Sequence, residues 1–95
     1  MRIISELESN DCVGGFIKDY KLDCKVNMKF TDYLRNFGQL TVLKDIKQPF
    51  YSLDREDYFT IKGLVGSDMI KVIYRPDNQE TAAKFLKKIV ADYHG

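Results

Sequence analysis

The segment from residue 58 to residue 75 has the clearest hydrophobic pattern in the chain. It contains two runs rich in β-branched and aromatic residues, YFTIKGLV and DMIKVIYR, separated by Gly66-Ser67. Such runs favour β-strands, and glycine accepts the positive φ that tight hairpin turns require. The pattern therefore predicts a β-hairpin in which Val65 faces Asp68 and Phe59 faces Tyr74.

This register separates two faces of the hairpin, because side chains alternate across a strand. A register shifted by one residue would place Lys71 and Arg75 on the face of Phe59 and Ile61, so we reject it. The predicted core face is almost entirely apolar: Phe59, Ile61, Gly63, Ile70, Val72 and Tyr74. The outer face mixes basic, aromatic and apolar side chains: Tyr58, Thr60, Lys62, Leu64, Met69, Lys71, Ile73 and Arg75.

The first half of the chain has weaker patterns. Residues 2–8 are predicted as a strand, although the same residues could begin a helix. Residues 11–21 are predicted as a helix because apolar residues recur there at helical spacing. Residues 23–30 alternate between apolar and polar and predict a strand, with a short helix over residues 32–37 capped by Thr31.

The later segments complete the predicted fold. A strand is expected over residues 39–47, ending before Pro49, and residues 50–57 are expected to be irregular. Asp77 and Glu80 resemble a capping box at the start of a final helix. The predicted fold is α+β: an antiparallel sheet of four to five strands, with a C-terminal amphipathic helix and a shorter N-terminal helix packed on one face. The apolar stripe of the final helix would pack on the core face of the hairpin: Ala82, Phe85, Leu86, Ile89, Val90 and Tyr93.

Length and charge narrow the functional classes. The 95 residues predict a single domain, 1–95. With 15 basic and 14 acidic residues the net charge is +1, which argues against a dominant electrostatic partner such as duplex DNA. No apolar run has the length of a signal peptide or a membrane span, so a cytoplasmic protein without a membrane partner is expected.

Residues with catalytic or metal-binding chemistry are sparse. Cys12 and Cys24 lie twelve positions apart and His94 is the single histidine, so no metal site or Cys-His pair is expected, and both cysteines are assigned to the core. The carboxylates of residues 54–57 are expected in a solvated loop. Gly14-Gly15 marks either a helix or a ligand loop and matches no phosphate-binding or dinucleotide motif. No cofactor is expected, and the chain is not expected to be an enzyme.

The outer hairpin face is the strongest functional candidate, although an ordinary solvated face is the simplest interpretation. The first functional hypothesis is a small interaction or regulatory module that binds a protein partner or forms a homodimer. Its contact residues would be Tyr58, Leu64, Met69, Ile73, Phe50 and Tyr51.

Two alternatives remain open. One is weak binding of single-stranded RNA, because sheets that bind RNA combine stacking aromatics with basic side chains. Its contacts would be Tyr58, Lys62, Lys71 and Arg75. The other alternative is a small-molecule site between the sheet and the first helix, near Gly14-Gly15.

Overall fold

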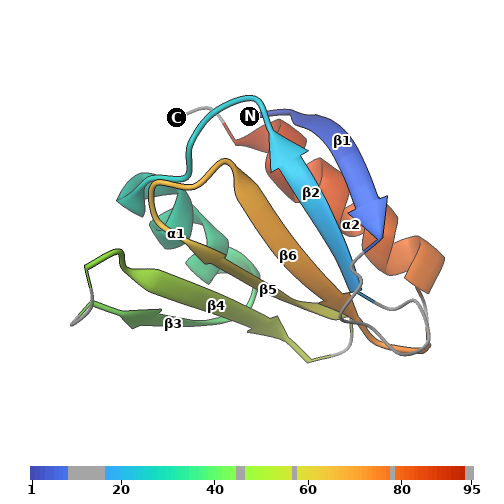
Figure 1. Ribbon diagram of the computed structural model, residues 1–95. Coiled ribbons are helices and arrows are strands. Elements are labelled where there is room, and N and C mark those ends of the chain that lie inside the picture. The colour runs from blue at the N-terminus through green and yellow to red at the C-terminus, as the bar shows by residue number, and fades with distance from the viewer. Residues whose placement is uncertain (9–16, 45–46, 57, 78, 94–95) are drawn as a thin grey trace.

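A computed structural model describes residues 1–8, 17–44, 47–56, 58–77 and 79–93 (Figure 1). Within these residues, six strands and two α-helices follow one another along the chain. In order they are β1 (Ile3–Glu8), β2 (Ile17–Leu22), α1 (Met28–Leu34), the 3₁₀ turn η1 (Arg35–Phe37), β3 (Gln39–Leu43), β4 (Phe50–Arg55), β5 (Phe59–Leu64), β6 (Met69–Tyr74) and α2 (Gln79–Asp92).

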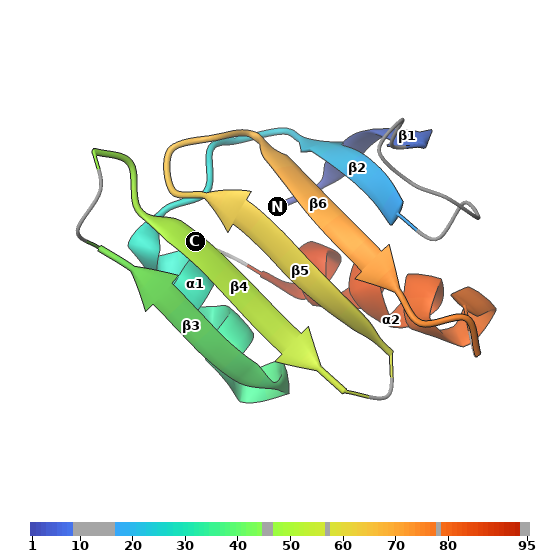
Figure 2. The same cartoon turned by 60° about the horizontal axis from the view of Figure 1, so that its bottom comes forward.

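The strands form one antiparallel sheet in the order β1-β2-β6-β5-β4-β3. Strands β3 to β6 are a meander, and β1 and β2 form a hairpin that joins the meander beside β6. Both helices lie on one face of the sheet, with α2 near β1 and β6 and α1 near β3 and β4 (Figures 1 and 2). The α+β class with an antiparallel sheet is confirmed. The predicted number of four to five strands is too low, and the shorter helix, α1, follows β2 instead of spanning residues 11–21.

The hairpin of β5 and β6 has the predicted register. Phe59 pairs with Tyr74, Ile61 with Val72 and Lys62 with Lys71. Gly66 has a φ of 96°, a backbone conformation that favours glycine, and the Ser67 backbone N–H donates to the Leu64 carbonyl at 3.1 Å. All the predicted core side chains of this hairpin are buried, and burying each large one contributes roughly 1.5–3 kcal/mol.

The predicted helix over residues 11–21 is wrong from residue 17 onward, and residues 11–16 lie outside the described residues. Residues 17–22 form β2, whose Tyr20 and Leu22 are buried while Lys21 is exposed. Ile17 pairs with Ile73 on the neighbouring β6. The segment contains apolar residues at both helical and strand spacing. Pairing with β6 favours the strand, because it gives hydrogen-bond partners to the backbone N–H and C=O groups of both β2 and β6.

The predicted strand over residues 23–30 is also wrong. The chain instead begins α1 at Met28, with Asn27 as N-cap: its side-chain oxygen accepts a hydrogen bond from the Phe30 backbone N–H at 2.9 Å. Thr31, predicted as the cap, is buried inside the helix. The alternation in this segment is misleading because Cys24, assigned to the core, is exposed.

Residues 50–55, expected to be irregular, form β4, which pairs with β3 on one side and β5 on the other. Tyr51 and Leu53 are fully buried in it, against Gly63 and Ile61 of β5. The alternation of Tyr51, Ser52 and Leu53 was a correct strand signal, hidden by the charged residues that follow. The strand matters for the candidate site because it places Phe50 on the outer face of the sheet.

The final helix is confirmed over Gln79–Asp92, and its apolar stripe completes the core. Glu80 and Lys84 form the expected exposed ion pair at 3.9 Å. Aromatic rings join the two helices: the Tyr93 ring lies 5.0 Å from the rings of both Phe30 and Tyr33. The Tyr33 hydroxyl also donates to the Ile89 carbonyl at 2.7 Å. Both helices are therefore fixed to one face of the sheet as a unit.

Candidate interaction surface

The outer face of the sheet is the side away from α1 and α2, and no described helix covers it (Figures 1 and 2). Strand pairing arranges its side chains in rows that cross the strands. One row, near the β5–β6 turn, is apolar: Leu43, Phe50, Leu64 and Met69. The next row is polar across five strands, at Thr41, Ser52, Lys62, Lys71 and Asp19, and ends at the exposed Leu7 on the β1 edge. The outer face is thus an apolar end beside a basic centre.

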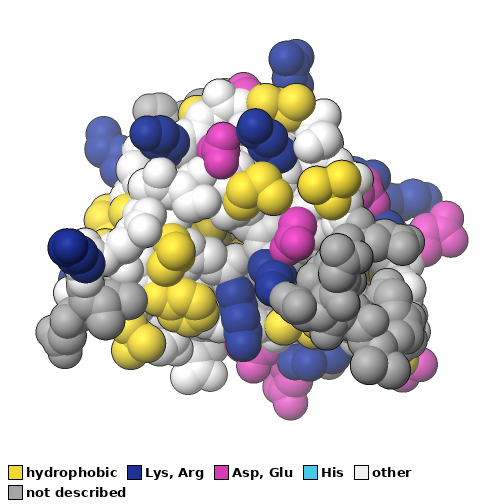
Figure 3. Space-filling model, in the orientation of Figure 1, with side chains coloured by type: hydrophobic (Ala, Val, Ile, Leu, Met, Phe, Trp, Pro, Cys, Tyr) yellow, Lys and Arg dark blue, Asp and Glu magenta, His cyan; other side chains and the backbone are white. Residues whose placement is uncertain are grey.

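The apolar row, which we call the apolar corner, is accessible. Leu43 is 55% exposed and Leu64 is 37% exposed, while Phe50 and Met69 are half-buried. Hydrophobic side chains gather over this end of β3, β4 and β5 in Figure 3, with basic side chains beside them. The sequence predicted Phe50, Leu64 and Met69 as contact residues but missed Leu43. Leu43 joins them because β4, which the sequence pattern did not predict, pairs Phe50 with both Leu43 and Leu64.

The basic centre contains two lysines on neighbouring strands. Lys62 lies directly across from Lys71, as predicted, and Lys71 lies across from Asp19 of β2. Two like charges in this position are mildly unfavourable, and a nearby carboxylate offsets part of the cost. A shallow hollow of about 290 Å³ runs between this centre and the apolar corner, lined by Asp19, Lys62, Leu64, Ser67, Met69 and Lys71 among others.

Ile73 lies half-buried on the outer face, between Ile17 of β2 and Thr60 of β5. Arg75, which follows β6, forms an ion pair with Asp54 and a hydrogen bond with the backbone of Glu56. Its Nη2 lies 3.2 Å from Asp54 Oδ1, and its Nε donates to the Glu56 carbonyl at 3.1 Å. The predicted nucleic-acid contact at Arg75 would therefore compete with an existing ion pair.

The predicted position of Tyr58 on the outer face is wrong. Its ring centroid lies 5.6 Å from that of Phe85, a residue of α2, so the ring lies on the helix-covered side. The Arg55 guanidinium carbon is 5.3 Å from the Tyr58 ring centroid and 4.5 Å from the Phe85 ring centroid. Strand β5 begins at Phe59, so Tyr58 lies outside the strand alternation on which the prediction relied. Tyr58, the aromatic residue named in the RNA hypothesis, therefore does not lie on the outer face.

Tyr51 is also removed from the predicted contact set. Its side chain is fully buried on the helix-covered face, where its hydroxyl has no hydrogen-bond partner among the described residues. Burial raises the pKa of this hydroxyl. Phe50, its neighbour in β4, lies on the opposite, outer face of the sheet.

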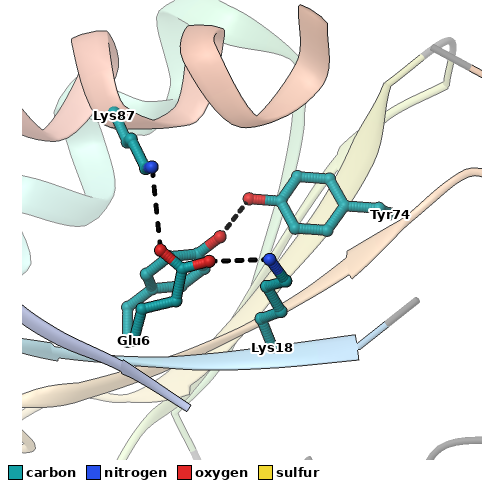
Figure 4. Close-up of polar contacts among 5 residues, drawn as sticks. Glu6, Lys18, Tyr74 and Lys87 are labelled. Carbon is teal, nitrogen blue, oxygen red and sulfur yellow. Dashed lines mark hydrogen bonds and ion pairs between the residues drawn. The ribbon is translucent and has the colours of Figure 1, made fainter. Parts of the chain in front are cut away.

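A polar cluster that the sequence did not predict lies at the other end of the sheet (Figure 4). The Glu6 carboxylate accepts a hydrogen bond from Lys18 Nζ at 2.7 Å and lies 3.6 Å from Lys87 Nζ. The hydrogen bond from Lys18 is the main cause of the lowered pKa of Glu6. This cluster joins β1, β2 and α2. No signal for it came from the sequence, because Lys18 was placed in the predicted helix over residues 11–21, which separates it from Glu6.

Two buried tyrosines lie beside this cluster. The hydroxyl oxygens of Tyr20 and Tyr74 are 2.5 Å apart, and burial is the main cause of the raised pKa of each. Both hydroxyls are therefore protonated at neutral pH. The geometry favours a structural role, since each hydroxyl satisfies the other in the core.

The remaining candidates offer little chemistry. Cys24 is exposed, which corrects its assignment to the core, and desolvation with a hydrogen bond to Asp23 raises the pKa of its thiol. Its nucleophilic thiolate is therefore scarce at neutral pH. Cys12, Gly14-Gly15 and His94 lie outside the described residues, as does any small-molecule site that they would form. Within the described ranges, no three His, Cys, Asp or Glu side chains form a metal-binding group, and no helix is long and apolar enough to cross a membrane.

Comparison with known proteins adds no further information: no protein-family model, no curated protein and no solved structure matches the chain. Function must therefore be argued from the chemistry of the surface itself.

Proposed function

We propose that this protein is a small non-enzymatic interaction module that binds another protein through the outer face of its sheet. The observation that supports this proposal is the apolar corner, where four large side chains lie in one row across four strands without a covering helix. Ile73 extends the contact surface toward the far end of β6. An apolar centre with a charged rim is the usual composition of a protein interface.

The partner that suits this face has acidic groups around an apolar centre. Lys62 and Lys71 lie directly across from one another beside the apolar corner, so a partner carboxylate there would relieve their repulsion. A second copy of the chain packed centrally on the same face would bring two such lysine pairs together, because a two-fold interface uses the same patch twice. We therefore favour a different protein over a copy of this chain as the occupant of this face.

The test compares three immobilised proteins: the wild type, Leu64→Asp and Leu7→Asp. Leu64 is in the apolar corner, whereas Leu7 is on β1 and is 58% exposed, so Leu7→Asp is a matched control for an added charge. Proteins retained from an extract of the source cells are quantified by mass spectrometry. Candidates retained by the wild type and the control, but not by Leu64→Asp, are purified and their affinity for all three proteins is measured by calorimetry.

The expected result is a purified partner whose affinity falls at least about tenfold with Leu64→Asp and is unchanged with Leu7→Asp. Circular dichroism checks that both variants are folded. Equal affinity for the wild type and Leu64→Asp would contradict the proposal. Salt-sensitive binding to a single-stranded RNA oligonucleotide, lost with Lys62→Glu and Lys71→Glu together, would support the RNA hypothesis in its place.

A further inference from the structure

The sheet has two edge strands, β1 and β3, each with one side that no other described strand pairs. An edge strand presents backbone N–H and C=O groups to which another strand can add. Natural proteins prevent such addition with charged side chains, proline or a covering element. The two edge strands of this sheet differ in charge: β1 contains charged residues and β3 contains none.

The β1 edge is protected by charge. Glu6 lies in the middle of the strand, and its carboxylate points to the helix-covered side, where Lys18 and Lys87 bind it. A hollow of about 420 Å³ lies between β1 and α2, and its lining includes Arg2, Glu6 and Lys87. A strand added to this edge would have to lie beside these charges, which makes β1 a poor template.

The β3 edge has no such protection. Its five residues, Gln39–Leu43, include no charged residue and no proline. Leu40 and Val42 point to the helix-covered side yet remain only half-buried, because no described strand lies beyond them. Thr41 and Leu43 are exposed on the outer face. Nothing in β3 disfavours a neighbouring strand, and two of its core side chains lack full cover.

A second copy of β3 fits this edge without conflict. In an antiparallel pair centred on a two-fold axis at Thr41, this residue faces its own copy, and Leu40 faces Val42 of the other chain. Both apolar residues lie on the helix-covered side in each copy, so they would cover one another. Lys44 would face Gly38, so no like charges face each other across the new pair.

We propose that two copies of this chain associate through β3, joining their six-stranded sheets into one continuous sheet. The occupant of this edge is the same segment of a second chain, because an uncharged strand with this pattern is complementary to itself. The outer faces of both copies lie on the same side of the joined sheet and remain accessible. The pairing therefore does not depend on the function proposed for that face.

The first experiment measures mass by light scattering over a concentration series for the wild type, Thr41→Lys and Ser5→Lys. Thr41 and Ser5 are exposed residues on the outer faces of the two edge strands, so Ser5→Lys is a matched control. We expect the wild type and Ser5→Lys to reach twice the mass of one chain. In Thr41→Lys two lysines would face each other across the two-fold axis, which should weaken association at least about tenfold at low salt.

A second experiment tests the register. In a background with Cys12→Ser and Cys24→Ser, Thr41→Cys should give a covalent dimer on mild oxidation, because directly opposite residues in a strand pair meet the Cα separation of a disulfide. Gln39→Cys should not, since its copy would lie at the far end of the paired strands. A wild type that stays monomeric at all concentrations would overturn the proposal. So would a Thr41→Lys dimer as stable as that of the wild type, or equal cross-linking at positions 39 and 41.

Discussion

The two ends of the sheet are held to the helical layer by different kinds of contact. At the β1 end, polar side chains make the connections: Glu6 binds lysines of β2 and α2, and the hydroxyls of Tyr20 and Tyr74 bind one another. At the β3 end, close backbone packing and aromatic rings dominate. There the Tyr51 hydroxyl has no partner among the described residues. The stability of the β1 end therefore depends on hydrogen-bonded and ion-paired polar groups, whereas that of the β3 end depends on close packing.

This difference explains why a further strand could pair with the β3 edge more readily than with the β1 edge. Charged groups that stabilise β1 against α2 also make its edge unsuitable for pairing. The β3 end achieves its packing without charges in the strand, so its edge stays neutral. The variants below separate the contributions of polar contact and of shape at each end, in order of decreasing expected effect.

The largest effect is expected for Gly38→Ala, at the β3 end. Gly38 has an extended φ of 173°, so the effect of a substitution there comes from packing and not from backbone strain. A Cβ at this position would lie 2.5 Å from the Asp54 carbonyl oxygen, which belongs to the backbone of β4. We expect a loss of about 3 kcal/mol in the free energy of unfolding, measured by denaturant titration. Ser5→Ala on the exposed β1 should change it by less than about 0.5 kcal/mol. Equal effects at the two positions would contradict the shape-based account of the β3 end.

The next largest effect is expected for Tyr20→Phe, at the β1 end. The variant leaves the buried Tyr74 hydroxyl without its partner, which should cost about 2 kcal/mol. Adding Tyr74→Phe removes the orphaned hydroxyl, so the double variant should lose less stability than the two single variants summed. Thermal or denaturant unfolding of all four proteins gives the coupling energy. Strict additivity would mean that the two hydroxyls do not interact.

Arg55→Met probes the mixed contact at the β3 end. Arg55 Nη1 donates to the Phe37 carbonyl at 2.7 Å, and its guanidinium carbon lies 4.5 Å from the Phe85 ring centroid. Methionine keeps the apolar contact with the ring but removes the hydrogen bond and the charge. We expect a loss of about 1 kcal/mol by denaturant titration. No loss would show that packing alone fixes η1 against β4.

Glu6→Gln tests the polar cluster through its pH dependence. The pKa of Glu6 is lowered in the folded protein, so the carboxylate stabilises the fold above its unfolded pKa, and this contribution disappears as pH falls through the folded pKa. The cluster is partly exposed, so the variant should lose less than about 1 kcal/mol at pH 7. Its stability should also decrease less than that of the wild type between pH 5 and pH 3, roughly the range in which a glutamate with a lowered pKa titrates. Parallel stability curves for the two proteins over this range would rule out a contribution from Glu6.

The smallest effect is expected for Tyr51→Phe. Its hydroxyl has no hydrogen-bond partner among the described residues, so removing it should change the free energy of unfolding by less than about 0.5 kcal/mol, or raise it slightly. Denaturant titration beside Tyr20→Phe gives a direct comparison of a buried hydroxyl with and without a partner. A loss as large as that of Tyr20→Phe would contradict the contrast between the two ends.

Local patterns predicted the elements whose neighbours in sequence are also their neighbours in space. The β5–β6 hairpin, including its register, follows from alternation and a turn glycine because its partner strand is the next segment of the chain. Helix α2 follows from a long apolar stripe, which a strand could not bury on one side. Leu64 and Met69 of the apolar corner were predicted for the same reason, whereas Phe50 was proposed as a contact within a segment expected to be irregular.

Tertiary structure decided the segments whose local pattern suits two conformations. Residues 17–22 have apolar residues at both spacings, and the unpaired side of β6 makes them a strand. Residues 50–55 form a strand because they pair with β3 on one side and β5 on the other, although their composition alone does not favour a strand. The accessibility of Phe50 and the burial of Tyr51 both depend on that pairing. Backbone pairing between strands therefore determined the candidate surface, because it fixes which face each side chain occupies.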